Sequence, residues 1–283
     1  MTPTFQITEY NDPGCPYGYS AEPWRHEIKW LYGDAVQIDL RLVGLTDDPD
    51  ALQRSGFTPE MNLANWRRFS ESYGMPFSFK SAGRHPATVP ACRAVVAARL
   101  HGEPGSDRLL MRWLRIHRFQ DELFDEQPVL DAAASDAGID PAELAKWVGD
   151  PATATALEED MKAARSPSRE AKALDHKLGG PPDERRYTCP SWEYVLVDGD
   201  AHFSAPGFQS REMYEAVIAN LAPGLSRRAP AEDPVQVLEW AGEPLATIEV
   251  AKLMGVNARK ATDALKASGA DEIALETSSL WKV

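Results

Sequence analysis

The chain has 283 residues, of which 43% are hydrophobic and 26% are charged, and its formal net charge is −13. This length and composition predict a globular protein of two or three units and exclude a disordered chain. The acidic balance argues against a general ligand of nucleic acid or of anionic membrane, because phosphate contacts need clustered lysine and arginine.

The first predicted strand covers residues 5–10 and is followed by turn residues 11–14, after which Cys15 stands at the start of a helix. That helix is predicted over residues 16–32, because its first residue is a proline and its apolar residues recur at helical spacing. Pro23 lies inside this helix and is expected to kink it.

Residues 35–45 alternate apolar and polar side chains and form the clearest predicted strand. The order of strand, helix and strand predicts a right-handed crossover onto a parallel sheet. It also places Cys15 at the carboxyl end of the first strand, where α/β proteins often bind ligands.

The segment from residue 58 to about 180 is mostly helical by pattern. Thr58 opens the first helix, residues 76–83 are expected to be extended or a loop, and the polar residues 166–186 are predicted to be a linker. Five further helices are predicted at about 89–101, 105–118, 127–137, 141–148 and 152–165.

Strands are predicted again at residues 192–197 and 201–203, joined by a turn at 198–200. An amphipathic helix is predicted after Gln209 and leads into a linker at 222–234.

Beyond that linker, residues 235–283 are predicted to form a separate small α+β unit. Thr247 is expected to cap a helix over 248–254, and Gly269 to end a second helix. Residues 273–275 and 280–281 are expected to be the two strands of a wing.

Cys15 is the most informative residue, in the run Asp12-Pro13-Gly14-Cys15-Pro16-Tyr17-Gly18. At a helix N-terminus, unpaired backbone N–H groups and the helix dipole favour a thiolate, so Cys15 is a candidate nucleophile. Gly18 stands where the second cysteine of a dithiol pair would be, which argues against ordinary dithiol exchange.

This run resembles the opening of the thioredoxin superfamily active site. So do Pro23, Pro190 before the strand at 192–197, and Gly207 before the last helix of residues 4–222. Within the superfamily the chain resembles DsbA-like proteins of the FrnE type, and its tail resembles a winged-helix module. The resemblance implies an α/β, thioredoxin-like fold with a large all-helical insertion and a small α+β C-terminal unit. The implied boundaries are a discontinuous thioredoxin-like domain at 1–85 and 185–225, a helical insertion at 86–184 and a winged-helix-like module at 231–283.

The resemblance also implies that Pro190 is a cis-proline facing Cys15. Cys189 would then approach Cys15, and a disulfide between them would replace the missing pair. Two alternatives stay open: Cys15 is a monothiol resolved by an external thiol, or it is inert and Cys189 only fills a tight space. The implied substrate-binding residues are Pro16, Tyr17, Gly18, Thr188 and Pro190.

Three functions follow from these alternatives. The first is a thiol–disulfide oxidoreductase acting through Cys15 alone or with Cys189 on a protein or small-molecule disulfide or thiol. The second is a redox-inactive binding or adaptor protein. The third is a glutathione-dependent isomerase or transferase similar to the kappa class, whose members typically carry serine where Cys15 stands. No cofactor is expected, apart from a low-molecular-weight thiol as co-substrate.

Other classes of function lack a motif. No histidine pair and no C-x-x-C has the spacing of a metal site, so none is predicted, and Cys92 in an apolar helix is expected to be buried and inert. The tail is too acidic to predict DNA binding. No apolar run approaches ~20 residues and no signal peptide is visible, so we expect a cytoplasmic protein that does not enter the membrane.

Overall fold

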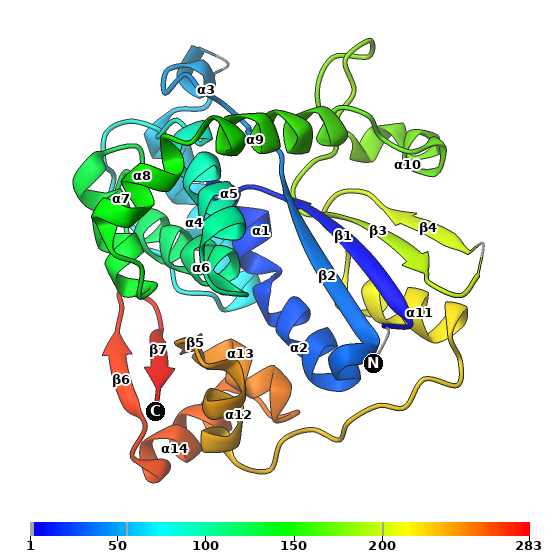
Figure 1. Cartoon of the computed structure of the whole chain (residues 1–283). Coiled ribbons are helices and arrows are strands. Elements are labelled where there is room, and N and C mark those ends of the chain that lie inside the picture. The colour runs from blue at the N-terminus through cyan, green and yellow to red at the C-terminus, as the bar shows by residue number, and fades with distance from the viewer. Residues whose placement is uncertain (1–2, 55, 200) are drawn as a thin grey trace.

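The computed structural model describes residues 3–54, 56–199 and 201–283. A four-stranded sheet has the order β2-β1-β3-β4 (Figure 1). Strand β2 (Val36–Leu42) runs parallel to β1 (Phe5–Asn11), whereas β3 (Ser191–Leu196) and β4 (His202–Ala205) are antiparallel additions. The predicted crossover and hairpin are therefore both present, although Asp200 of the predicted turn lies outside the described residues.

The predicted first helix is divided into α1 (Pro16–Ser20) and α2 (Glu22–Tyr32) at Ala21. Pro23 lies in the first turn of α2, where its missing N–H leaves no hydrogen bond unmade. A short 3-10 turn, η1 (Gly33–Ala35), then leads into β2. Helices α2 and α11 (Arg211–Leu221) share one apolar core with the sheet, which includes Phe5, Ile28, Trp192 and Tyr214.

In the helical block, the ends of the predicted helices agree with the structure to within two residues. The block contains α3 (Ala51–Arg54), α4 (Pro59–Tyr73), α5 (Val89–His101), α6 (Ser106–Phe119), α7 (Gln127–Asp136), α8 (Pro141–Val148) and α9 (Pro151–Ala164). Its core is continuous with the sheet, because Leu40 and Leu42 at the end of β2 pack into it. The prediction of a linker at 166–186 was wrong in part. This segment holds α10 (Arg169–Ala173), capped by the Ser168 hydroxyl, and the 3-10 turn η2 (Asp175–Lys177).

The C-terminal unit has its own sheet, of order β5-β7-β6. It comprises α12 (Pro234–Ala241), β5 (Leu245–Ala246), α13 (Thr247–Leu253), α14 (Ala258–Ser268), β6 (Asp271–Ala274) and β7 (Ser279–Lys282). Helix α12 was not predicted. Thr247 is not the cap of α13, because its hydroxyl accepts the Trp281 indole N–H at 2.8 Å, and Ala246 holds the N-cap position.

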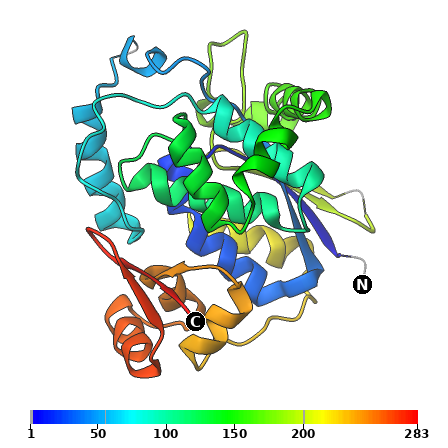
Figure 2. The same cartoon turned by 60° about the vertical axis from the view of Figure 1, so that its left-hand side comes forward.

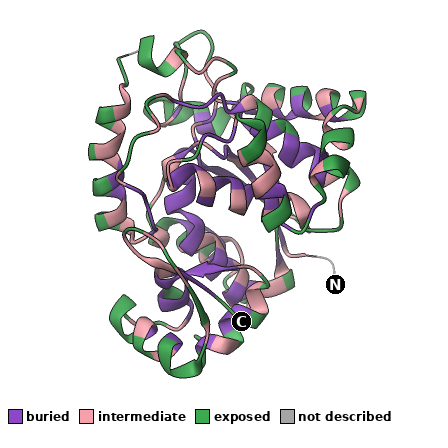
Figure 3. Cartoon of the chain, turned by 90° about the vertical axis from the view of Figure 1, so that its left-hand side faces the viewer, coloured by how far each residue is buried: buried purple, intermediate pink, exposed green. Residues whose placement is uncertain are grey.

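The C-terminal unit packs against α2 (Figure 2). Trp30 of α2 enters the core of that unit, beside Leu238 and Trp281, so the buried interior runs from one unit to the other (Figure 3). The predicted fold class is confirmed: an α/β, thioredoxin-like fold with a helical insertion and a small α+β C-terminal unit. In the described part of the chain, no helix is both long and apolar enough to cross a membrane.

Candidate functional site

Cys15 lies where the sequence places it, at the N-cap of α1 just beyond β1. Its side chain is almost buried, with 7% exposed. The thiol donates a hydrogen bond to the backbone oxygen of Cys189 at 3.2 Å, so two residues 174 positions apart meet at this point. Both cysteines are free thiols that share a small apolar cluster with Val43 and Ala164.

The peptide bond between Cys189 and Pro190 is cis, as the resemblance implies. Hydrogen bonds hold this loop in place: the Ser191 hydroxyl donates to the Thr188 oxygen at 2.5 Å and accepts from the Gly207 N–H at 2.8 Å. Thr188 in turn donates its hydroxyl to the Lys177 oxygen at 2.7 Å. These bonds fix Cys189 opposite Cys15.

The two thiols differ in acidity. A hydrogen bond from the Cys189 thiol lowers the pKa of Cys15, against the opposing effect of burial, and the Gly18 N–H adds to this lowering. Burial raises the pKa of Cys189 well above its usual range, and the interaction with Cys15 raises it further. The pKa values of the two thiols are therefore shifted in opposite directions, with that of Cys15 the lower.

Asp12 organises the loop before Cys15. It is fully buried, and its carboxylate accepts hydrogen bonds from the Gly14 N–H at 2.8 Å, the Leu45 N–H at 2.9 Å and the Thr88 hydroxyl at 3.0 Å. The Cys92 thiol also donates to it at 3.5 Å, which ties Cys92 to the site as a buried structural group. Burial raises the pKa of Asp12, although these donors oppose the change.

Gly18 lies in α1 with no room for a side chain. A Cβ atom there would come within 2.2 Å of the Asn11 Oδ1 atom and 2.8 Å of an Arg115 guanidinium nitrogen. Neither neighbour is free to move, because Asn11 binds Glu9 and Arg115 pairs with buried Glu22. A cysteine at position 18 would therefore require its neighbours to change as well, because they pack directly against the glycine.

A cavity of about 360 Å³ opens beside Cys15 and has the size of a small-molecule site. Of the residues predicted to bind substrate, Pro16 lines it. Tyr17 instead packs on Phe69, with ring centroids 4.6 Å apart. Gly18, Thr188 and Pro190 shape the surroundings of the two cysteines without lining this cavity.

A larger groove of about 680 Å³ lies between α2, β2 and α6. It contains Arg25, Lys29 and Arg108 but no cysteine. Arg25 and Arg108 are paired with Glu22 and Glu9, respectively. The smaller cavity is the one that Cys15 lines.

Sequence reasoning missed a row of arginines on α6. Arg108, Arg112, Arg115 and Arg118 recur every three or four residues, which is the spacing of one helix face. The last three are 1–5% exposed, so this face is buried rather than solvated. The regular spacing of the arginines was the available signal, but a charged row of this kind usually faces water.

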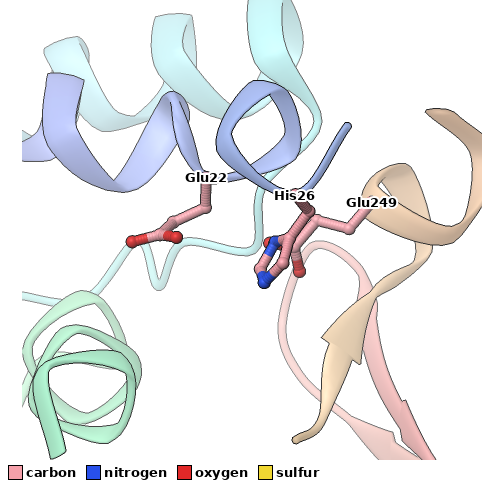
Figure 4. Close-up of side chains that lie close together, drawn as sticks. All are labelled: Glu22, His26 and Glu249. Atoms are coloured by element: carbon pink, nitrogen blue, oxygen red, sulfur yellow. The ribbon is translucent and has the colours of Figure 1, made fainter. Parts of the chain in front are cut away.

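Glu22, His26 and Glu249 form a buried group with ligand atoms within 4.8 Å of one another. Figure 4 shows Glu22 and His26 on α2, and Glu249 reaching His26 from α13. Arginines occupy both carboxylates: Arg115 and Arg25 bind Glu22, and Arg112 binds Glu249 at 2.5 Å. A metal cation would have to displace these guanidinium groups. We therefore assign Glu22, His26 and Glu249 to ion pairing, which includes the contact between α2 and the C-terminal unit.

The chain has relatives of known structure with the same fold. The cytosolic disulfide reductase DsbM of Pseudomonas aeruginosa is 14% identical, with a TM-score of 0.54 over 77% of this chain and 98% of that one. A protein of Nitrosomonas europaea, provisionally assigned as a protein disulfide isomerase, is 16% identical, with a TM-score of 0.59 over 78% of this chain and 98% of that one. At such identities the likeness shows the fold alone.

Among curated proteins, the ClpXP adapter protein SpxH of Shouchella clausii is 27% identical over 159 residues. These residues are 56% of this chain and 52% of that protein, so the match spans about half the length of this relative. The family model of the DSBA-like thioredoxin domain matches residues 6–168, which include Cys15 and the helical block and stop before Cys189. That match covers more than half of the chain, which therefore belongs to the DSBA-like thioredoxin domain family.

Proposed function

We propose that the protein is a thiol–disulfide oxidoreductase in which Cys15 is the nucleophile and Cys189 the resolving thiol. The observation that carries this proposal is the meeting of the two cysteines: the Cys15 thiol lies 3.2 Å from the Cys189 backbone oxygen, and the Cys189 side chain contributes most to lowering the pKa of Cys15. A lowered pKa on the attacking sulfur and a raised pKa on its neighbour suit thiol–disulfide exchange. The lack of room at Gly18 supports the use of Cys189 in place of a local second cysteine.

The exchange would proceed in two steps. The Cys15 thiolate attacks a disulfide RS–SR, so that a Cys15–SR bond forms and one RS⁻ leaves. The Cys189 thiol gives its proton to that RS⁻, and its sulfur attacks the Cys15 sulfur. A Cys15–Cys189 bond forms and the second RS⁻ leaves, so one disulfide is reduced while two protein thiols are oxidised. Without Cys189, an external thiol would have to resolve the Cys15–SR intermediate.

Disulfide mapping after oxidation tests this proposal. We expect peptides containing Cys15 and Cys189 to be linked, while Cys92 stays free. In Cys189→Ser, we expect a low-molecular-weight disulfide to leave a lasting adduct on Cys15, and in Cys15→Ser no adduct. If Cys15 and Cys189 are both fully alkylated after oxidation and no adduct forms, the protein is not an oxidoreductase of this kind.

The second candidate function is an adaptor that binds a protein partner without redox chemistry. It is favoured by the 27% identity to SpxH, which is named as a ClpXP adapter. The two functions differ in what they require of Cys15. Alkylation of Cys15 well below pH 8 supports the oxidoreductase, whereas a slow thiol with an ordinary pKa supports the adaptor.

We further propose that the chain is of the FrnE type and acts in the cytoplasm, where a low-molecular-weight thiol can reduce it. The domain boundaries would be 1–85 with 185–225, 86–184 and 231–283. We propose that the last of these is a winged-helix-like packing module rather than a DNA reader. Its contact with α2 through Trp30 and Glu249 supports this role.

A further inference from the structure

Arg118 is a buried cation without a counter-ion. Its side chain belongs to α6 and is 5% exposed, yet it lines the cavity beside Cys15. Within residues 3–54, 56–199 and 201–283, its guanidinium makes no ion pair and no hydrogen bond. A buried charge is normally paired, so an empty guanidinium in a cavity indicates a place for an anion.

The rest of the arginine row shows what Arg118 lacks. Arg108 pairs with Glu9 at 2.6 Å and Arg112 with Glu249 at 2.5 Å, and Arg115 pairs with Glu22. Each of these carboxylates comes from an element outside α6. Arg118 repeats the pattern one turn further along the helix, at the point where the protein leaves a cavity instead of a carboxylate.

The surroundings hold Arg118 in place without neutralising it. Its guanidinium carbon lies 4.8 Å from the ring centroid of Trp66, which lines the same cavity. The two acidic groups that act on its charge are Asp121, which accepts the Ala82 N–H at 2.7 Å, and Asp125, whose Oδ2 atom pairs with Arg84 at 2.7 Å while its buried Oδ1 atom accepts no hydrogen bond from any described residue. Stacking on one face of a guanidinium leaves its N–H edge available to a ligand.

Arg118 also remains a cation. Burial lowers its pKa to about 10, although Asp121 and Asp125 oppose the change, so it is still protonated at neutral pH. The cavity therefore combines the guanidinium groups of Arg118 and Arg186 with the Cys15 sulfur and an apolar wall that includes Leu45 and Pro86.

We propose that Arg118 is the carboxylate subsite of the cavity, and that the preferred substrate is a small thiol or disulfide carrying a carboxylate near its sulfur. This inference rests on the proposed oxidoreductase function. In the exchange step, the carboxylate binds Arg118 while the Cys15 thiolate attacks the nearer sulfur of RS–SR; a Cys15–SR bond forms and RS⁻ leaves. The guanidinium fork suits a planar carboxylate, with two parallel N–H···O bonds.

Three symmetrical disulfides of similar size test the subsite: the anionic 3,3′-dithiodipropionate, the neutral 2-hydroxyethyl disulfide and the cationic cystamine. The readout is the rate at which each forms a mixed disulfide with Cys15, divided by its rate with free cysteine. We expect the anion to be preferred over the neutral compound by about tenfold or more, as for a charge-assisted pair. In Arg118→Gln this preference for the anion should fall sharply, and Arg186, which lines the same cavity, accounts for what remains. Arg118→Lys should retain part of it, and Arg259→Gln on the distant α14 should behave as wild type.

A second assay needs no redox step. Iodoacetate and iodoacetamide differ in charge but not in shape, so the ratio of their alkylation rates at Cys15 reports the subsite directly. Wild type should favour iodoacetate relative to Arg118→Gln. If the disulfides do not react but this ratio still depends on Arg118, the oxidoreductase fails and the subsite stands. If the neutral disulfide reacts and neither assay shows a preference for the anion, the subsite fails and the oxidoreductase stands. Equal loss with all three disulfides in Arg118→Gln would make Arg118 structural and overturn the proposal.

Discussion

At the scale of single residues, Gly18 and Cys189 together determine which dithiol the site can form. The helix position that would hold a second cysteine is filled by the Asn11 amide and the Arg115 guanidinium. The cis-proline loop instead brings a cysteine to Cys15 from just before β3, the strand that pairs with β1. The pair is thus nonlocal, and its geometry depends on how β1 and β3 are joined in the sheet.

Gly18→Ala tests the first of these contacts. Alanine would normally stabilise a helix by up to about 1 kcal/mol relative to glycine. Here its Cβ must displace buried, hydrogen-bonded groups, which costs about 1–3 kcal/mol. We therefore expect a net loss in the free energy of unfolding, measured with urea. Gly224→Ala, where a Cβ meets nothing within 4 Å, should be close to neutral. A Gly18 variant at least as stable as wild type would show that the site tolerates a side chain.

Cys189→Ala tests the second contact through the acidity of Cys15. The Cys189 thiol is the main group that lowers the pKa of Cys15, so its removal should raise that pKa. We expect the midpoint of Cys15 alkylation, followed by intact mass, to move to higher pH. Cys189→Ser keeps a hydroxyl donor and should move the midpoint less. An unchanged midpoint in both variants would assign the acidity of Cys15 to other groups.

The sequence identified the residues that carry the proposed chemistry but not the residues that support them. Cys15 and Pro190 could be found because each stands in a short motif next to an element boundary. Arg115 and Arg118 could not, because their importance comes from contacts across 90 or more residues or from the lack of any. Periodicity shows which face a residue occupies, but not what meets it there.

At the scale of elements, α6 links the helical block to the other two parts of the molecule. Its arginines reach Glu9 on β1, Glu22 on α2 and Glu249 on α13. Burial raises the pKa of Glu249, but the charges of Arg112 and His26 outweigh this effect and hold it at about 2. The Glu249 carboxylate is therefore ionised in the folded protein. Its buried charge depends on Arg112 of α6 and His26 of α2 for compensation.

Arg112→Met should reveal that dependence. The substitution leaves Glu249 buried with His26 as its remaining ion-pair partner, and breaking a buried ion pair costs about 3–5 kcal/mol. We expect a loss of that size in urea denaturation, with partial recovery in the double variant Arg112→Met, Glu249→Gln, which removes the orphaned charge. Lys146→Met breaks an exposed pair with Glu143 and should change stability little. A loss in Arg112→Met no larger than in Lys146→Met would contradict this account.

Element boundaries were predictable where a local signal was sufficient. Thr58 caps α4 and Gly269 ends α14 as their sequence contexts predict. Thr247 fails because its hydroxyl is bound to Trp281 on β7, a tertiary partner that competes with capping. At the N-terminus of α13, the Glu249 carboxylate instead accepts the backbone N–H of Ala246 at 2.6 Å. That same carboxylate binds Arg112, so helix capping and docking share one group.

At the scale of the whole molecule, the contact between the C-terminal unit and α2 is both apolar and charged. Trp30 and Leu238 bury apolar surface, while His26 lies between two carboxylates of the C-terminal unit. Its Nε2 atom is 2.7 Å from Glu243 and its Nδ1 atom 3.0 Å from Glu249. The linkers in the sequence predict where one unit ends and the next begins. They do not predict that His26 in one unit will meet Glu243 and Glu249 in another, because no local pattern marks such a contact.

This arrangement makes the stability of the docked molecule depend on pH. Burial and Arg25 act to lower the pKa of His26, but Glu249 and Glu243 outweigh them and raise it above 6.5. A raised pKa means that protonation stabilises the fold: the contribution is fully present below about pH 6.5 and is lost as the pH rises through the folded value. We therefore expect the free energy of unfolding to fall between pH 6.5 and alkaline pH.

In His26→Gln, which cannot be protonated, the fall should be smaller and the stability at pH 6 lower. His176→Gln, at an exposed position, should follow wild type. Parallel curves for wild type and His26→Gln would show that His26 docks the C-terminal unit without its charge.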